Sequence, residues 1–435
     1  MEIQNNRLLS IDSSDIKDGV LYLPESVVIL GDWVIKDEPG LVTVVAPGLT
    51  TIENENFLEC KALTHFEAPM LKTIGGYNFR FCNGLTRFEA PVLTSIGDGN
   101  FYQCNALMHF EAPLLATIES YNFDHCNALT HFKAPALNVI NYSNFQFCNA
   151  LIDFVAPVLT LIGYSNFEEC NALARFEAPV LTEIRELNFR TCKALTNFIV
   201  PMLTAIDDDN FYKCEALTDF EAPMLTSIGH DNFAFCITLQ HFKTPMLTAI
   251  GRDNFFACAL THFEVPELTI METGNFEECD ALTNVRLGKY NYTVKSADRV
   301  LTIIEKTKKR NEIRIHTGFI LNSYNGGAPY LSETVLVEKD GFFAHGETVK
   351  KAMEDLQFKI AVEKIKKEPI YEDTLITETY YRTVTGACEQ GIKNWREENN
   401  ITVESLTAKE LLPILEKTNA YGMEQFKALI TFESI

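Results

Sequence analysis

Cysteine is the chemically active residue with the most regular placement in this chain. Eleven of the twelve cysteines recur about every 22 residues. No CxxC pair accompanies them, and a column of thiols pointing in one direction disfavours disulfide geometry. We therefore expect reduced thiols that fill a core, with a metal or redox ladder as the alternative. The eleven are Cys60, Cys82, Cys104, Cys126, Cys148, Cys170, Cys192, Cys214, Cys236, Cys258 and Cys279.

A second pattern combines histidine, arginine and acidic side chains at two fixed positions of the same period. Two interpretations stay open for this strand-face row: solvated side chains inherited from repeat duplication, or a docking face for a protein or peptide partner. His109 and His131 lie one period apart, so a shared metal ion is a third possibility. The candidate residues are His65, Glu67, Arg87, Glu89, His109, Glu111, His131, Arg175, Glu177, Asp219, Glu221, His241, His262 and Glu264.

Residues 289–435 contain the best candidates for catalysis. His345 and His316 are titratable near neutral pH, and Glu347, Asp355 or Cys388 are possible companions. No nucleophile elbow, phosphate-binding loop, HExxH motif or paired-carboxylate spacing accompanies them. We therefore predict that the protein is not an enzyme, with no catalytic, metal-binding or cofactor-binding residue.

The repeat itself must position these side chains. In the segment Leu63-Thr-His-Phe-Glu-Ala-Pro, apolar residues at the first, fourth and sixth places face a core, and the residues between them point outward. Proline then ends the strand, since it cannot donate a ladder hydrogen bond. An asparagine precedes one phenylalanine in eleven successive turns, and backbone groups at a bend are its expected partners.

The pattern Asn-Phe-x-x-Cys-x-Ala-Leu-Thr-x-Phe-x-Ala-Pro-x-Leu-Thr-x-Ile resembles the BspA-type leucine-rich repeat, known from bacteria, their phages and some protists. The resemblance covers roughly residues 27–288. It implies a solenoid, which we expect to have about twelve turns and an N-terminal cap within residues 1–52. It also implies adhesion or protein binding, often outside the cell.

The remaining residues predict a small α+β module. Strands at 299–305 and 312–320 are expected around a basic loop at 306–311, followed by a hairpin turning at Asp340-Gly341. Helices are expected from Thr348 to about Lys367 and at 378–399, 407–417 and 421–431. The motifs Asp340-Gly-Phe-Phe-Ala-His-Gly and Thr385-Gly-Ala-Cys-Glu-Gln-Gly resemble a module on leucine-rich repeat proteins of gut bacteria and their phages.

The expected organisation is therefore α+β. It comprises a solenoid at 1–288, a hairpin-containing connector at 289–345 and a helical module at 346–435. The solenoid carries 37 acidic against 16 basic residues, which disfavours nucleic acid along it. No apolar run is long enough to span a bilayer, and the first residues lack a secretory signal, so a cytoplasmic protein is expected.

The preferred function is a non-enzymatic protein-binding scaffold that uses the strand-face row. One alternative is a phage- or mobile-element-related assembly factor that acts through the C-terminal module. The second is an enzyme or nucleic-acid-processing factor whose activity lies in 289–435. The sequence leaves the oligomeric state open.

Overall fold

A computed structural model describes residues 1–272, 274–287, 290–297, 300–322, 330–367, 370–385, 387, 389–418 and 420–431. The chain divides into two compact units. The first comprises Met1–Glu305 with Phe319–Ser332, and the second comprises Lys306–Gly318 with Glu333–Ile435. Strands β30 (Val300–Arg310), β31 (Ile313–Asn322) and β32 (Tyr330–Lys339) therefore contribute residues to both.

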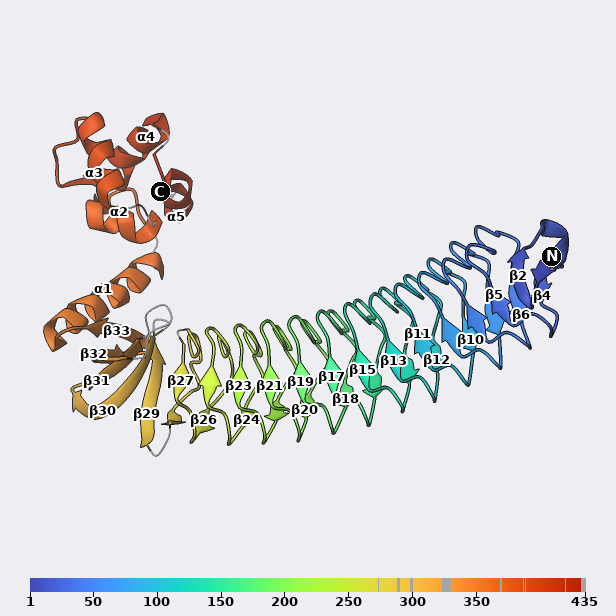
Figure 1. Ribbon diagram of the computed structural model, residues 1–435. Helices are drawn as coiled ribbons and strands as arrows, with labels where there is room; N and C mark the ends of the chain where they lie inside the picture. The colour runs from blue at the N-terminus through green and yellow to red at the C-terminus, as the bar shows by residue number, and fades with distance from the viewer. Residues whose placement is uncertain are drawn as a thin grey trace. The chain divides into compact units, whose positions relative to one another are not determined.

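The first unit is a solenoid of thirteen turns, one more than the sequence suggested (Figure 1). One column of two-residue strands runs its whole length as a parallel sheet, preceded by β1 (Glu2–Gln4), which pairs antiparallel with β2 (Arg7–Ser10). The column continues through β5 (Ile29–Leu30), β7 (Thr51–Ile52), β9 (Thr73–Ile74), β11 (Ser95–Ile96), β13 (Thr117–Ile118), β15 (Val139–Ile140), β17 (Leu161–Ile162), β19 (Glu183–Ile184), β21 (Ala205–Ile206), β23 (Ser227–Ile228), β25 (Ala249–Ile250) and β27 (Ile270–Met271).

A second column of mostly three-residue strands forms the other face of each turn. Neighbouring strands within each segment of this column pair in parallel, at a step of 22 residues. They are β6 (Thr43–Val45), β8 (His65–Glu67), β10 (Arg87–Glu89), β12 (His109–Glu111), β14 (His131–Lys133), β16 (Asp153–Val155), β18 (Arg175–Glu177), β20 (Asn197–Ile199), β22 (Asp219–Glu221), β24 (His241–Lys243), β26 (His262–Val265) and β28 (Asn284–Leu287).

The apolar repeat positions form one continuous core. Leu63, Phe66 and Ala68 are fully buried, as the strand pattern predicted. Two phenylalanine columns run through this core: Phe79 stacks on Phe101 with ring centroids 5.2 Å apart, and Phe88 meets Phe101 edge-on at 4.9 Å. Offset and edge-to-face ring contacts stabilise the stack beyond the burial of apolar area alone.

The asparagine column fastens each turn to the one before it. The backbone N–H of Asn144 donates to Oδ1 of Asn166 at 2.7 Å. In turn, Nδ2 of Asn166 donates to the carbonyl of Asn141 at 2.8 Å and to that of Gly163 at 2.9 Å. All eleven repeat asparagines are buried, so the predicted structural role of this column is confirmed.

The cysteine column is buried and free of disulfides. Each thiol from Cys82 to Cys279 donates to the carbonyl of a phenylalanine in the preceding turn; the Sγ of Cys104 lies 3.0 Å from the oxygen of Phe79. The thiols are therefore hydrogen-bonded core groups and more than fillers. Burial raises the pKa of the Cys60 thiol to about 11 and that of Cys214 to about 12.

The arc that closes each turn has an alternating backbone. Tyr77, Phe79 and Phe81 all have φ near +60°, a region that residues other than glycine rarely adopt. Inter-turn hydrogen bonds hold this conformation. The N–H groups of Tyr77 and Phe81 donate to the following turn at 2.6 and 2.8 Å, and that of Phe79 donates to the preceding turn at 3.0 Å.

The ends of the solenoid are closed by additional strands. At the start, β3 (Ile16–Lys17) pairs antiparallel with β4 (Val20–Tyr22), which pairs in parallel with β6. The first turn thus begins near Arg7, earlier than the Val27 that sequence comparison suggested. At the far end β28 pairs antiparallel with β29 (Tyr290–Ala297), and β29 pairs with β30 (Val300–Arg310).

The second unit begins with the outer part of a hairpin. The prediction of a basic loop at 306–311 is wrong in part. Strand β30 continues to Arg310, and only Asn311 and Glu312 form the turn before β31 (Ile313–Asn322). The hairpin at Asp340-Gly341 is confirmed: β32 (Tyr330–Lys339) pairs antiparallel with β33 (Phe342–Gly346), and both turn residues have positive φ. Helix α1 (Val349–Lys367) follows, as predicted.

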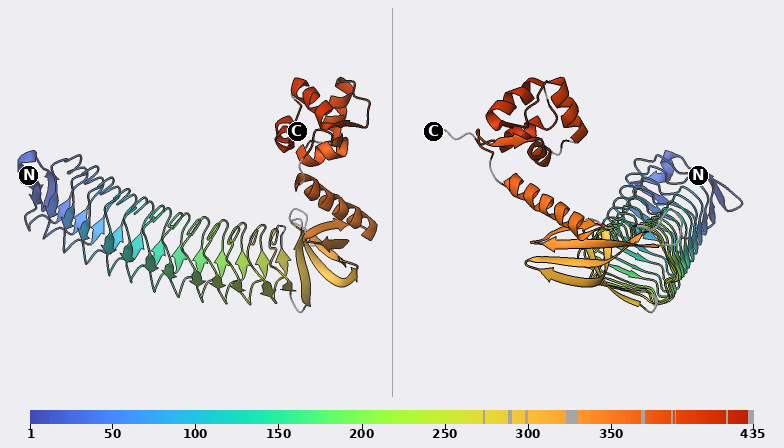
Figure 2. Two further views of the ribbon diagram at one scale, coloured as in Figure 1. Left: turned by 180° about the vertical axis from the view of Figure 1, so that it is seen from behind. Right: turned by 90° about the vertical axis from the view of Figure 1, so that its left-hand side faces the viewer.

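The rest of this unit has its own apolar core around Tyr381, Leu411 and Phe426. The single helix expected at 378–399 is two, α2 (Glu378–Thr385) and α3 (Glu389–Glu398). Helices α4 (Ala408–Thr418) and α5 (Met423–Leu429) match the expectation. The strands β34 (Leu375–Thr377) and β35 (Ser405–Thr407), which pair antiparallel, were not foreseen. Figure 2 shows the solenoid and the helices of the second unit from two further sides.

Candidate functional site

The strand-face row lies where the repeat pattern placed it. All fourteen candidate residues belong to the second strand column, on β8, β10, β12, β14, β18, β22, β24 and β26. In these strands the middle residue is buried and its two neighbours are exposed or half-buried, since side chains alternate across a strand. The row therefore presents a polar surface over most of the solenoid.

Most carboxylates of this row are already paired with a lysine or arginine of the same strand column. Lys133 lies 2.7 Å from Glu111, and Lys243 lies 3.4 Å from Glu221, each from the neighbouring turn. Arginine and glutamate also pair within the strands, as in Arg175 with Glu177. Because exposed ion pairs stabilise only weakly, these charges remain available to a partner. The fourteen residues include seven carboxylates and two arginines, so the row itself is acidic.

A row of apolar side chains at the neighbouring corner was missed by the sequence interpretation. In these turns the four-residue segment x-Pro-x-Leu, which usually starts with alanine, forms a β-turn; the N–H of Leu71, for example, donates to the carbonyl of Ala68 at 3.0 Å. The residue after proline projects from that corner. Seven of these nine residues are between 40% and 52% exposed. The corner row comprises Met70, Val92, Leu114, Ala136, Val158, Val180, Met202, Met224 and Met246.

The corner row can be recognised in the sequence from the residue types that follow the repeat proline. Nine successive turns place only Met, Val, Leu or Ala after the proline, whereas surface positions in a duplicated repeat normally become polar. Contiguous exposed apolar patches mark interaction surfaces on soluble proteins. Further acidic residues lie on the arcs, at positions such as Asp207, Asp208 and Asp209.

The metal interpretation of the histidines gains no support from geometry. The rings of His109 and His131 lie 5.3 Å apart, and His131 is 3.7 Å from Asp153. Across the described residues, no three or more His, Cys, Asp or Glu side chains gather in a way that would hold a metal ion.

The histidines proposed for catalysis lie in the second unit. His316 is buried on β31, with Nδ1 2.8 Å from Thr307 Oγ1 and Nε2 3.8 Å from Glu338 Oε1. Arg314 also pairs with Glu338 at 2.7 Å. Sequence reasoning singled out neither Thr307 nor Glu338. His345 lies on β33 opposite Leu336, and Cys388 lies outside the described residues.

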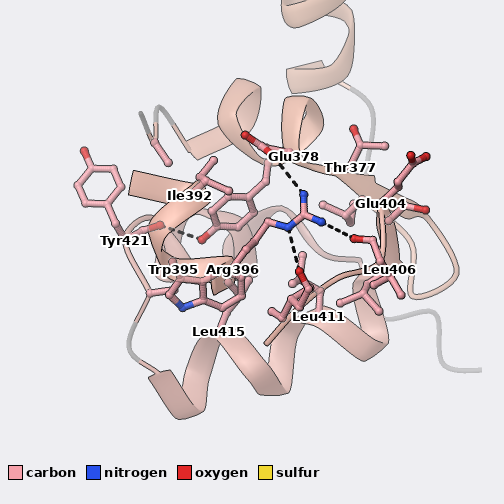
Figure 3. Close-up of a pocket in the computed structure, with 17 residues that line it drawn as sticks. Thr377, Glu378, Ile392, Trp395, Arg396, Glu404, Leu406, Leu411, Leu415 and Tyr421 are labelled. Atoms are coloured by element: carbon pink, nitrogen blue, oxygen red, sulfur yellow. Dashed lines mark hydrogen bonds and ion pairs between the residues drawn. The ribbon is translucent and has the colours of Figure 1, made fainter. Parts of the chain in front are cut away.

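The helical part of the second unit contains a hollow of about 380 Å³ (Figure 3). Its walls come from α2, α3, α4 and the β34–β35 pair, with Ile392, Leu411 and Leu415 among the apolar side chains that line it. Trp395 and Tyr381 add aromatic surface. No sequence motif predicted this site, because the sequences of the segments that line it are typical of ordinary amphipathic helices.

The polar groups of the hollow are satisfied by one another. Arg396 donates to Glu378 Oε2 at 3.2 Å and to the carbonyls of Ile401 and Val403 at 3.4 and 2.6 Å (Figure 3). Tyr381 donates its hydroxyl to the carbonyl of Tyr421 at 2.8 Å. Desolvation by burial raises the pKa of Tyr381 to about 12, so the hydroxyl stays neutral.

A membrane span is not found in the described part of the chain, where every helix is too short or too polar to cross a bilayer. That finding agrees with the absence of a long apolar run in the sequence.

Comparison with known proteins identifies the repeat. The family model for the BspA type leucine rich repeat region matches residues 50–174, 138–245 and 204–297, together more than half of the chain. No curated protein matches. A leucine-rich repeat protein from Bacteroides ovatus is 18% identical with a TM-score of 0.46, over 65% of this chain and 85% of that one. The pneumococcal vaccine antigen PcpA is 13% identical with a TM-score of 0.36, over 65% and 75%.

Proposed function

Because this chain belongs to the BspA-type leucine-rich repeat family, we propose that it is a non-enzymatic scaffold that binds a protein partner. The partner docks across the corner row and the adjoining strand-face row. The observation that carries the proposal is the run of nine apolar residues at successive corners, seven of them about half exposed. Such a surface gains free energy when a partner covers it.

The two rows have different roles in this proposal. The corner row supplies most of the affinity, because its side chains lose contact with water on docking. The strand-face row supplies the polar rim and the choice of partner, since its ion pairs can exchange members with a partner's charges. The acidic arcs disfavour nucleic acid as that partner. The eleven described thiols, all reduced, favour a reducing compartment such as the cytoplasm.

A double substitution tests the corner row. Met202→Lys with Met224→Lys places two charges on the row at exposed positions, so the fold should survive. We expect at least a tenfold loss in capture of the partner from an extract of cells that encode the protein, quantified by mass spectrometry. Ile237→Lys is the matched control, because Ile237 is 55% exposed and lies outside both rows.

Two results would reject the proposal. One is equal capture by the wild-type protein and both variants. The other is retention of the whole captured set by a chain in which the corner row is fully charged. The second result would favour an assembly role of the C-terminal unit, with the solenoid acting only as a spacer.

A further inference from the structure

The hollow in the second unit is formed by residues that should be the core of a small fold. Ile376, Ile392, Leu411 and Leu415 are each at most 7% exposed, yet all four face the same space of about 380 Å³. Protein interiors are normally packed with few voids larger than a water molecule. A space of this size in a segment of about 60 residues has the dimensions of a small-molecule site.

The chemistry of an occupant follows from the walls. Each guanidinium nitrogen of Arg396 already donates, to Glu378, Ile401 and Val403. The indole N–H of Trp395 donates to Thr418 Oγ1 at 3.0 Å, and the Tyr381 hydroxyl is bonded to Tyr421. These bonds use three of the five guanidinium N–H groups, the single indole N–H and the hydroxyl proton, so the groups keep few donors for an occupant. A charged group moved into such a space loses its hydration and gains no partner.

The rim adds a preference against anions. Glu404 is an exposed carboxylate among the lining residues, next to Val403 and Ser405. The cation nearest to it among the lining residues, Arg396, is neutralised by Glu378. A neutral hydroxyl at the rim is tolerated, because it stays in contact with water and with Ser405.

We propose that this hollow binds a small, uncharged, predominantly apolar molecule. The aliphatic walls hold an alkyl or aryl body, and the indole of Trp395, fixed by its bond to Thr418, forms one side of the site. The interaction is independent of the solenoid surface and of the partner proposed for it.

Trp395 makes the site measurable in the full-length protein. The chain has two tryptophans, and Trp33→Phe removes the exposed one in the solenoid. In that background we expect 1-octanol to change Trp395 emission in a saturable way. Octanoate and octylammonium share the alkyl chain and serve as matched probes, and we expect each to bind at least tenfold more weakly.

A space-filling substitution links the signal to the hollow. Ala420 lines it, so Ala420→Phe should occupy part of it and weaken 1-octanol binding at least tenfold, with an unchanged or higher thermal midpoint. Ala361→Phe is the control, because Ala361 is exposed on α1 and should change neither value. If Ala420→Phe does not fold, Leu415→Ala enlarges the site and should raise affinity for 1-decanol relative to 1-octanol.

The proposal fails if Trp395 emission shows no saturation with 1-octanol, or if octanoate binds as tightly. It also fails if neither Ala420→Phe nor Leu415→Ala changes the affinities in the stated direction. Because each measurement uses purified protein and simple alcohols, failure here leaves the scaffold function untouched.

Discussion

At the scale of single residues, the same asparagine recurs because one side chain serves two turns. Its oxygen accepts a backbone N–H of the preceding turn, and its amide nitrogen donates to between one and three carbonyls, as Asn144 and Asn166 show. No other side chain of that size offers both functions, since aspartate lacks the donor and leucine lacks both.

Asn166→Ala is expected to destabilise the solenoid by about 3 kcal/mol or more, because buried backbone partners left unsatisfied cost about 1–3 kcal/mol each. Urea unfolding followed by circular dichroism measures the change. Asn127→Ala is the control: Asn127 is exposed and its side chain bonds those of Asn105 and Asn149 at 3.0 and 3.3 Å, so its loss should cost less than about 0.5 kcal/mol. Equal effects at both sites would contradict the ladder's role.

Residue types alone predicted the buried positions but not all of their contacts. The inward Leu63, Phe66 and Ala68 followed from periodicity, because alternation in a short strand leaves few options. The hydrogen bond from each thiol to a phenylalanine carbonyl could not be predicted in this way. It depends on the positive φ of residues in the arc, and the residue types in the arc do not indicate that conformation. The fourteen strand-face residues were located correctly, and their binding role stays a prediction.

At the scale of elements, each turn is a unit that fits onto any other. Ser143 and Ser165 occupy the same place one turn apart, with φ of 52° and 56°. The strands, both phenylalanine columns and the asparagine ladder all repeat at the same step. Elements in the second unit lack this redundancy, which is why the break between α2 and α3 and the β34–β35 pair escaped prediction.

Deletion of residues 144–165 joins Ser143 to Asn166 and removes one complete turn. We expect a folded protein whose thermal midpoint falls by less than about 5 °C, because stability in a repeat array is a sum over similar interfaces. Deletion of 144–154 removes half a turn and should abolish cooperative unfolding, since inward residues then face solvent. Calorimetry distinguishes the two. A comparable collapse of both would show that the turns are not interchangeable.

At the scale of the whole molecule, the stacked thiols couple stability to alkaline pH. Burial raises the pKa of every described cysteine above its ordinary value of 9.0, to about 11 for Cys60 and about 12 for Cys279. Their contribution is therefore complete below pH 9, where folded and unfolded thiols are both protonated. It is lost as pH rises through the folded pKa values, because only the unfolded chain releases the protons.

We expect the urea midpoint to fall steadily between pH 9 and 10.5, at constant ionic strength. Each thiol that ionises only on unfolding contributes up to about 1.4 kcal/mol per pH unit. A Cys148→Ala, Cys170→Ala double variant distinguishes the contribution of the thiols from that of lysines and tyrosines. Its unfolding should release two fewer protons, so its free energy of unfolding should fall less steeply with pH. An identical slope in the variant would assign the alkaline loss to other groups.

The parallel pairing of turns also has a mechanical consequence. The backbone hydrogen bonds between successive turns point along the solenoid, so every interface between turns carries a tension applied to the two ends, and the weakest interface yields first. Extension would therefore release turns sequentially, each adding a length of slack chain, instead of rupturing the fold in one event. A partner bound to the corner row over several turns would hold those turns together and so raise the force needed to separate them.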